Sequence, residues 1–513
     1  MGANSNRSFL GSDDPHKWGS SLPRPSFGQL NLQTLWIITP VITMLIIMLI
    51  TPLREGDLFW NLKVGEGIYT THQIPNTDNF SITVAGQPYP YARYWLSDLV
   101  LYLVYRWFGM SGMVLLQALV GGIIIGLLSA ESFARRANPR ATAIVLLLVM
   151  LFPISHARSQ MFTFLFFALF AWILSGFWYQ RSQRLWLLPL LMAIWVNMHP
   201  GWIMGLALLG LVNGLAILET LLKRMEWKRL RLLLAWSLVT ALAVVIYPRG
   251  WLIYQDVLST TSNPIIHSLI TEWQPISLAD TATYPFFVLL VFLLAGLSFS
   301  RRRLDLYGFG LILVFLSLAF YMIRLIPFYY IVAAPILAAL LSELPLPRLS
   351  SKTEVKGSNP SVKATANLVI LVVMLAGVVI CLPPVRLRLS GQSSNVLLHR
   401  FWPQGAADYL LAQKQTGMRI YNLQDWSGYL LWRLYPQGQV FMTSGVELYT
   451  MKILQDYLTI YHAEPGWLDK LKDYQVDYLV LSTEQQSTLV KAAQEAKLPE
   501  VYSDDISSIF TVP

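Results

Sequence analysis

The sequence predicts an α-helical polytopic membrane protein with a small α/β domain at its C-terminus. The 513 residues are 55% hydrophobic and only 13% charged, whereas a water-soluble chain carries about a quarter charged residues. The apolar runs are continuous over roughly 17 to 25 residues, the length that crosses a bilayer as a helix, and they do not alternate as barrel strands do. After residue 383 the sequence changes to short β-rich runs between amphipathic stretches.

About eleven segments are long and apolar enough to be membrane helices. The segment 96–108 could add a half-span, and residues 1–33, rich in Ser, Pro, Gly and Asn, are expected to form a flexible tail. We expect residues 34–342 to form the transmembrane body, 343–365 a linker and 366–382 the last helix. The eleven segments lie near 34–52, 110–130, 141–155, 161–180, 185–197, 201–222, 232–247, 284–300, 306–323, 326–342 and 366–382.

The connections between the predicted helices alternate between the two sides of the membrane, and one of these two sets holds most of the basic residues. The positive-inside rule places this richer set in the cytoplasm. We therefore expect a multi-pass protein of the plasma (inner) membrane with a cytoplasmic N-terminus, and with the first loop, 53–98, and residues 383–513 outside. The net charge of +9 does not indicate nucleic acid, because the basic residues punctuate the spans instead of forming one patch. The richer set holds Arg135, Arg136 and Arg140; Arg181 and Arg184; Lys223, Arg224, Lys228, Arg229 and Arg231; Arg301, Arg302 and Arg303; Arg348, Lys352, Lys356 and Lys363.

Residues 383–513 are predicted to form a small extracytoplasmic α/β domain. Strands that alternate with helices favour a sheet that is partly parallel. The segment lacks GxGxxG and GxxxxGK[ST] motifs, so nothing in it indicates nucleotide binding. The β-rich runs are 419–422, 439–442, 477–482 and 507–512, and the amphipathic stretches include 424–435 and 484–497.

The scarce charges on the outward side predict a functional site. Asp57 follows the first predicted helix, in Arg54-Glu55-Gly56-Asp57, where a carboxylate is costly near lipid unless it faces protein or water. Each later outward turn adds at least one polar or ionisable group. Converging in a bundle, these groups would line one cavity with cations suited to a phosphate. The candidates are Asp57, Asp78 and Arg93 in the first loop, then His156, Arg158, Gln160, His199, Arg249, Glu272 and Arg324.

Several of these candidates also have a structural interpretation. Arg249 could be an anchor at a helix end, and His156 and His199 could be packing residues. Asp78 could begin a turn in Asn76-Thr77-Asp78-Asn79.

An aromatic side chain and a cation are further candidates in the first loop. Trp60 could stack on a sugar ring or anchor the loop at the membrane interface. The carboxylates of Asp57 and Asp78 could hold a divalent cation, since hard cations prefer oxygen ligands. The single cysteine, Cys381, excludes a cysteine metal site and an intramolecular disulfide.

Short sequence motifs are distributed over nearly the whole chain. In the first loop they are Asp57 to Leu62, Gly65, Gly67-Ile68, Ile74-Pro75, Asp78 to Ser81, Thr83 and Trp95-Leu96; later ones are Arg158 to Phe162, Asn197 to Gly201, Glu272 to Pro275, Arg324 to Phe328 and Trp426 to Leu430. This layout resembles the GT-C glycosyltransferases, the membrane class that includes protein O-mannosyltransferases and aminoarabinose transferases. The motifs are most similar to those of bacterial multispan members of that class. One departure is Arg93-Tyr94, where such relatives often carry His-Glu.

The resemblance implies a glycosyltransferase that moves a sugar from a polyprenyl-phosphate donor to an acceptor hydroxyl on the extracytoplasmic face, with inversion. The acceptor would be a glycan, lipid or protein. Asp57 would be the base, and Arg158 and Arg324, with Arg249, would bind the phosphate. Three alternatives stay open: a lipid or polysaccharide transporter or assembly subunit, a polysaccharide polymerase or ligase, and a GT-C scaffold that only binds. A secondary transporter would usually show internal repeats, and none is evident in the sequence.

Overall fold

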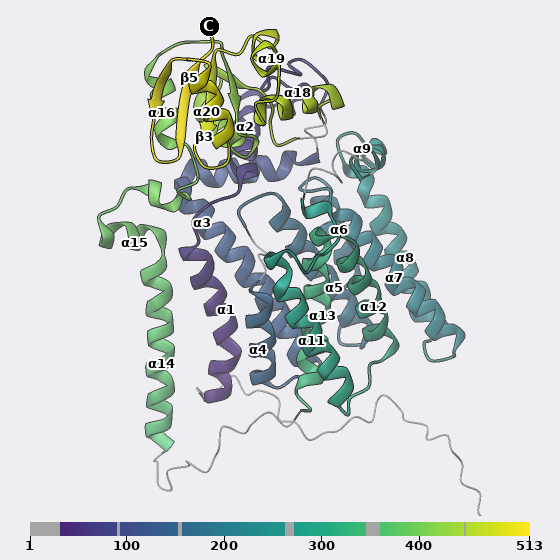
Figure 1. The fold of residues 1–513 in the computed structure, drawn as a ribbon. Coiled ribbons are helices and arrows are strands. Elements are labelled where there is room, and N and C mark those ends of the chain that lie inside the picture. The colour runs from purple at the N-terminus through teal and green to yellow at the C-terminus, as the bar shows by residue number, and fades with distance from the viewer. Residues whose placement is uncertain (1–30, 90–92, 152–155, 262–270, 345–359, 446–447) are drawn as a thin grey trace, which may run out of the picture.

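The computed structural model describes residues 31–89, 93–151, 156–261, 271–344, 360–445 and 448–513. Long helices form a bundle, and a small α/β domain covers one end of it (Figure 1). The predicted fold class, a helical membrane protein with a C-terminal α/β domain, is confirmed. Most of the predicted tail 1–33 and linker 343–365 lies outside the described residues.

Each predicted membrane segment coincides with a helix. By length and composition, eight helices in the described part of the chain could cross a membrane, and three shorter apolar helices accompany them. A further helix, α9 (Leu252–Thr261), was not predicted. The apolar helices are α1 (Leu32–Ile50), α3 (Trp95–Ala134), α4 (Pro139–Val149), α5 (Gln160–Trp178), α6 (Leu187–Trp195), α7 (Trp202–Leu221), α8 (Trp227–Ala243), α11 (Tyr284–Phe299), α12 (Leu306–Tyr321), α13 (Ile326–Leu341) and α14 (Pro360–Cys381).

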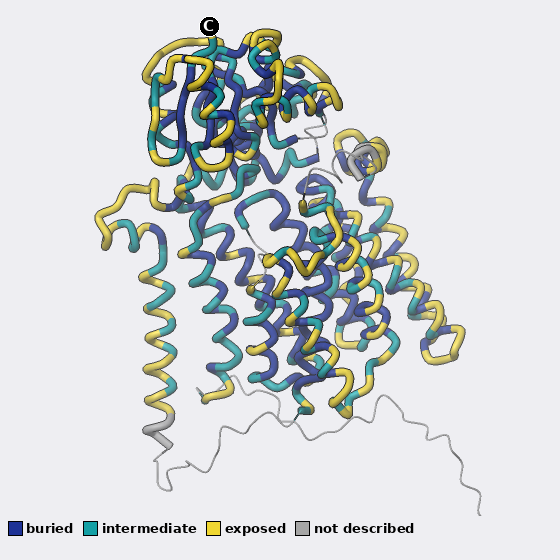
Figure 2. The backbone as a smooth tube through the Cα atoms, viewed as in Figure 1, coloured by how far each residue is buried: buried dark blue, intermediate teal, exposed yellow. Residues whose placement is uncertain are grey.

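One helix, α13, lies at the centre of the bundle, and another, α14, lies at its edge. Every residue of α13 is buried, because α3, α4, α5, α11 and α12 pack around it. The apolar window of α14 is unburied, and this helix stands apart from the bundle with exposed residues along its length (Figure 2). It contacts α1, where Gly377 approaches Ile46. An apolar helix that is exposed in this way is suited to lipid.

Helix α3 consists of two arms joined at Gly109. The backbone there has φ 59° and ψ −154°, a conformation that glycine adopts without a Cβ penalty. The first arm packs on α2 (Gly56–Thr71), and the contact is so close that a Cβ at Gly65 would overlap the Asp98 carbonyl. The segment 96–108 thus forms a separate arm that covers the helix of the first loop, and its position as a half-span stays a prediction.

The C-terminal domain is built on one mixed sheet with the strand order β2-β1-β3-β5-β4. β1 pairs in parallel with β2 and β3, and β5 is antiparallel to β3 and β4. The partly parallel sheet was predicted, whereas β4 and the helices α16, α18 and α19 were not. The elements are α15 (Pro383–Ser390), α16 (Gln404–Ala412), β1 (Met418–Asn422), α17 (Ser427–Leu434), β2 (Gly438–Val440), α18 (Met451–Tyr461), α19 (Trp467–Asp473), β3 (Tyr478–Ser482), α20 (Ser487–Glu495), β4 (Glu500–Ser503) and β5 (Ser507–Thr511).

The first loop is docked onto the C-terminal domain by backbone hydrogen bonds. Leu53 N–H donates to Leu397 O over 2.8 Å, and His399 N–H donates to Leu53 O over 3.0 Å. Further along the loop, Ile82 N–H donates to Val440 O over 2.9 Å, and Val440 N–H donates to Phe80 O over 3.1 Å. The loop therefore extends the sheet at β2.

Aromatic packing adds to this docking at the start of α2. The Phe59 ring lies 5.0 Å from the rings of both Trp402 and Tyr429 and 5.3 Å from that of Trp432. The Trp402 indole also donates to Leu53 O over 2.9 Å. Aromatic contacts of this kind are worth about 0.5–1.5 kcal/mol each beyond the area they bury. They fix the N-terminus of α2 between the bundle and the domain.

A buried ionic cluster joins helices at the end of the bundle opposite the C-terminal domain. The Glu131 carboxylate of α3 accepts from Arg135 Nε over 2.8 Å and from Arg181 Nη2 over 3.0 Å. Ser175 of α5 donates its hydroxyl to the same carboxylate. The Glu131 side chain is only 8% exposed, so its charge depends on these partners.

We expect Glu131→Gln to lower the free energy of unfolding by about 3–5 kcal/mol, because it leaves the Arg135 guanidinium, only 12% exposed, and that of Arg181 without their anion. Chemical unfolding in detergent measures this loss. Glu219→Gln is the matched control, since its partner Arg224 is 66% exposed and 4.0 Å away. A loss of under about 1 kcal/mol in both variants would show that the cluster does not stabilise the bundle.

Candidate active site

Asp57 lies in the first turn of α2. The chain enters this turn through Gly56, which the C-terminal domain approaches so closely that a Cβ at Gly428 would overlap the Gly56 carbonyl oxygen. The N-terminus of a helix favours a negative charge. The Asp57 side chain is 48% exposed, so its carboxylate is held by a fixed helix end at the border between the surrounding protein and solvent.

Arg158, just before α5, is the centre of the charged cluster. Its Nη1 lies 3.3 Å from Glu55 Oε2 and 3.9 Å from Asp57 Oδ2. Its Nη2 donates to Glu272 Oε1 over 2.9 Å. His156, two residues earlier in the chain, contacts Glu55 Oε1 through Nδ1 over 2.7 Å. One guanidinium group thus joins three carboxylates from two loops.

Glu272 connects this cluster to Arg324. Its Oε2 lies 3.4 Å from Arg324 Nη1, and the Arg324 guanidinium stacks over the Trp273 ring at 5.5 Å from the ring centroid. The two turns, Thr271–Trp273 and Ile323–Leu325, are joined by a hydrogen bond of 3.0 Å from Ile323 N–H to Gln274 O. The two arginines therefore share one carboxylate.

The carboxyl groups of the cluster have different pKa shifts. Burial by the surrounding protein raises the pKa of Asp57; Arg158 opposes this shift, whereas Glu55 and Glu272 add to it. Burial also acts against the charged form of Glu55, but Arg158 and His156 outweigh it and lower the pKa of Glu55 to about 2. Asp57 is thus the carboxyl group that takes up a proton more readily than usual, as a general base requires.

Glu272 and Arg158 are held in their charged forms. Burial acts to raise the pKa of Glu272, but Arg158 and Arg324 outweigh it, so the pKa is lowered. Burial acts to lower the pKa of Arg158, but Glu55 and Glu272 outweigh it, so the pKa is raised. The cluster therefore places a permanently charged guanidinium group beside the Asp57 carboxyl group, whose pKa is raised.

His199, between α6 and α7, is a buried neutral imidazole near both arginines. Its Nδ1 accepts from Gly201 N–H over 2.9 Å and contacts the Thr163 hydroxyl at 2.8 Å. Burial, with the charges of Arg324 and Arg158, lowers its pKa well below the ordinary value. Because Nδ1 is an acceptor, the ring proton is on Nε2.

Trp60 and Asp78 are buried in structural positions, and their contact with a substrate stays a prediction. Trp60 is 6% exposed and packs edge-on against Phe80 at 5.4 Å between ring centroids. Asp78 is fully buried, and its Oδ1 accepts from the amides of Phe80 and Ser81 over 2.8 and 2.9 Å. It is therefore the turn-former that the Asn76-Thr77-Asp78-Asn79 sequence also allowed.

The other sequence candidates lie around the cluster. Gln160 is buried in the first turn of α5, and its Oε1 has no hydrogen-bond donor among the described residues. Arg93 is buried beside the start of α3. Arg249 is exposed in the turn after α8, and the ion pairs of the cluster are made by Arg158 and Arg324. Substrate contact by Gln160, Arg93 and Arg249 stays a prediction.

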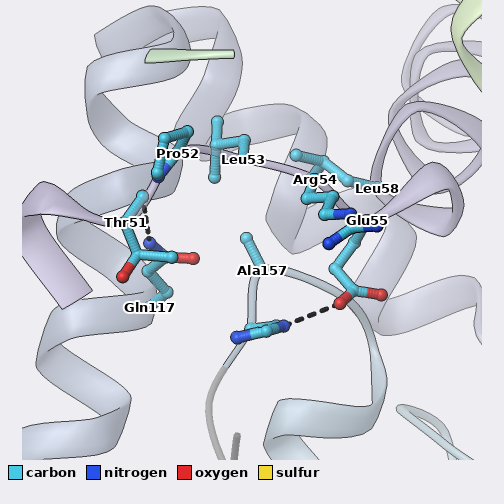
Figure 3. A pocket seen from close by; sticks show the side chains of 9 residues that line it. Thr51, Pro52, Leu53, Arg54, Glu55, Leu58, Gln117 and Ala157 are labelled. Atoms are coloured by element: carbon cyan, nitrogen blue, oxygen red, sulfur yellow. Dashed lines mark hydrogen bonds and ion pairs between the residues drawn. The ribbon is translucent and has the colours of Figure 1, made fainter. Parts of the chain in front are cut away.

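One residue of the cluster, Glu55, was absent from the candidates. Glu55 precedes Asp57 by two positions and lines a small pocket with Arg54 and His156, where the Glu55–His156 contact is visible (Figure 3). A second acidic residue beside the predicted base was a signal that could have been used.

The fold and the site together define a polytopic membrane protein with an acid and two arginines at one end of its helical bundle. Two solved structures are similar to the chain. ArnT from Cupriavidus metallidurans, bound to undecaprenyl phosphate, has a TM-score of 0.50 and 16% identity over 94% of this chain and 98% of that one. The archaeal oligosaccharyltransferase AglB from Archaeoglobus fulgidus, in complex with an inhibitory peptide and a dolichol-phosphate, has a TM-score of 0.50 and 10% identity over 88% of this chain and 70% of that one.

These similarities show the fold. The chain has the GT-C fold of membrane glycosyltransferases, as the sequence motifs predicted. No family model and no curated protein matches the sequence.

We expect the ion pairs of Glu55 to make stability depend on pH. Because the pKa is lowered from 4.5 to about 2, the stabilisation is complete above pH 4.5 and is lost as the pH falls toward 2. A shift of this size corresponds to roughly 3 kcal/mol. Melting temperatures measured across this range should fall less steeply for Glu55→Gln than for the wild type.

Glu66→Gln is the control for this pH dependence, since Glu66 pairs with Lys63 at 42% exposure. It should keep the wild-type slope. An equal slope in Glu55→Gln would mean that the Glu55 cluster does not contribute to the acid lability.

Proposed function

We propose that the protein is a membrane glycosyltransferase that moves a sugar from a polyprenyl-phosphate donor to an acceptor hydroxyl. The observation that carries this proposal is the position of Asp57 Oδ2, 3.9 Å from Arg158 Nη1, in a chain with the GT-C fold. A carboxylate and a guanidinium group that are neighbours offer a base and a phosphate ligand within one site. The similar structures contain undecaprenyl phosphate and a dolichol-phosphate, which supports the donor class.

Arg158 and Arg324 would bind the phosphate of the donor. In the unliganded protein both pair with Glu272, over 2.9 and 3.4 Å, so their guanidinium groups already converge on one anion. Planar guanidinium groups suit phosphate oxygens because they donate two hydrogen bonds in parallel. The uncharged His199 could add its Nε2–H as a further donor. The polyprenyl chain would stay in the bilayer, beside the apolar helices.

The transfer would be a single displacement. The acceptor hydroxyl attacks the anomeric carbon and loses its proton to the Asp57 carboxylate. The bond between that carbon and the phosphate oxygen breaks, and its electron pair leaves on polyprenyl phosphate. The two arginines stabilise the charge that grows on the leaving phosphate. Attack opposite the leaving group inverts the anomeric centre.

The proposal includes the orientation and the partners. The basic clusters Arg135–Arg136 and Arg181 lie in the connections at the bundle end away from the C-terminal domain, which supports a cytoplasmic position for that end in the plasma (inner) membrane. The C-terminal domain would then be extracytoplasmic, and the acceptor would be a glycan, lipid or protein. A divalent cation beside Asp57 stays a prediction, and no step of the transfer depends on it.

Replacing the base should stop transfer without removing the donor site. Asp57→Asn is expected to lower the transfer rate by about 10²–10⁴-fold, the usual contribution of general-base catalysis. Release of polyprenyl phosphate from a panel of radiolabelled polyprenyl-phosphate sugars measures the rate, and native mass spectrometry measures bound undecaprenyl phosphate. Wild-type turnover in this variant would remove Asp57 from the mechanism.

Removing a phosphate ligand should weaken donor binding. Arg324→Ala loses a charge-assisted hydrogen bond worth about 1.5–3 kcal/mol, which raises the Kd for undecaprenyl phosphate about ten- to a hundred-fold. Arg106→Ala is the control, since its guanidinium stacks on Tyr69 at a distance from the ion pairs of the cluster. Equal affinities in the two variants would assign Arg324 to membrane anchoring.

A further inference from the structure

Glu272 occupies the position where the two arginines of the candidate active site meet. Its Oε1 accepts from Arg158 Nη2 over 2.9 Å, and its Oε2 lies 3.4 Å from Arg324 Nη1. A carboxylate that bridges two guanidinium groups in this way uses both of its oxygens, as a phosphate group does. A phosphate bound between the two arginines needs the N–H groups that Glu272 holds. The Glu272 carboxylate and the donor phosphate therefore exclude each other.

The charges of the cluster lead to the same exclusion. The carboxylates of Glu55, Asp57 and Glu272 all lie within 3.9 Å of an Arg158 nitrogen, and Arg324 adds the second guanidinium group. Three negative charges thus already face two positive ones. A donor phosphate would bring a fourth, and like charges at such short distances repel one another. One carboxylate has to leave for the phosphate to bind.

Glu272 is the carboxylate that can leave. Glu55 is held on its other side by His156 Nδ1 at 2.7 Å, and Asp57 is fixed in the first turn of α2. The Glu272 side chain is 37% exposed, and the described contacts of its carboxylate are those with the two arginines. Rotation of this side chain into water therefore breaks only the contacts that the phosphate replaces.

The backbone around Glu272 does not need to move in such a rotation. The Trp273 ring stacks on the Arg324 guanidinium at 5.5 Å from the ring centroid, and Gln274 O accepts from Ile323 N–H over 3.0 Å. These contacts hold the turn of Glu272 on the turn that carries Arg324. Exchange of the carboxylate for a phosphate is thus a side-chain movement, and both arginines stay in place.

We propose that Glu272 is an internal substitute for the donor phosphate and that its exchange with the phosphate on Arg158 and Arg324 sets the affinity of the site. This inference rests on the proposed function. The phosphodiester of a polyprenyl-phosphate sugar carries one negative charge, as the carboxylate does, so the exchange conserves charge. The released polyprenyl phosphate carries about −1.5 to −2 and binds the arginines more tightly. Return of the carboxylate helps to displace this product.

The first experiment measures the Kd of undecaprenyl phosphate by native mass spectrometry. Glu272→Gln removes the competing charge, so the Kd is expected to fall by about ten- to a hundred-fold, the effect of one charge-assisted hydrogen bond. Glu272→Asp keeps the charge but is one methylene group shorter, and it shows part of this gain. Glu66→Gln is the control, since Glu66 pairs with Lys63, and it keeps the wild-type Kd.

The direction of the change separates the alternatives. Weaker or unchanged binding in Glu272→Gln overturns the inference, because Glu272 would then be a ligand of the donor or a bystander. A gain in Glu272→Gln with a wild-type Kd in Glu272→Asp also overturns it, since the charge would then act without exchange. Both results leave the proposed function intact. If undecaprenyl phosphate binds neither the wild type nor Glu272→Gln, the donor class fails, and the inference fails with it.

The second experiment follows the carboxylate itself and needs no donor sugar. A water-soluble carbodiimide couples an amine to accessible carboxylates, and mass spectrometry of the peptides quantifies the modification of Glu272. Undecaprenyl phosphate is expected to raise this modification, because the displaced side chain turns to water, and to leave that of Glu66 unchanged. Protection of Glu272, or an equal rate with and without the lipid, overturns the exchange.

Discussion

The whole site depends on one guanidinium group, that of Arg158, which contacts carboxylates from the first loop and from the turn before α11. Such a charge is stable away from bulk water only when it is paired and hydrogen bonded. Glu55 and Glu272 provide that pairing, so Asp57 at 3.9 Å is not needed for it. Asp57 is therefore the carboxyl group of the cluster with a raised pKa. It can exchange a proton beside the fixed positive charge of Arg158.

Much of the architecture could be predicted because it follows from solvation. Long apolar runs must become helices in lipid, since the backbone has no other way to satisfy its polar groups there. The turns at one end of a helical bundle lie near one another. This explains why Asp57, Arg158, Glu272 and Arg324 could be grouped from the sequence. The parallel pairing of β1 with β2 and β3 was predictable from strands that alternate with helices.

Contacts between segments that are distant in the sequence, or between the parts of one loop, could not be predicted, because hydrophobic periodicity does not record them. The sequence does not show which residues cover Trp60, so it could be assigned to a ligand. In the structure Phe80 and Tyr89 of its own loop pack against it. Asp78 was ambiguous because the same carboxylate can accept from a turn or from a substrate. Gly109 turns α3 back over α2 through a single positive φ, which hydropathy alone does not reveal. Glu55 pairs with Arg158 although the two residues are distant in the sequence, a contact that only the packing of the two segments reveals.

The bond between Leu53 and Trp402 joins residues that are 349 positions apart, and this spacing affects how the protein is made. At about 5–20 residues per second, a ribosome needs on the order of tens of seconds to travel from one to the other. During that interval the newly emerged first loop has no sheet edge to join, so its docking waits for the later domain. Docking of the first loop is thereby coupled to synthesis of the C-terminal domain, and a chain that ends before Trp402 lacks this contact.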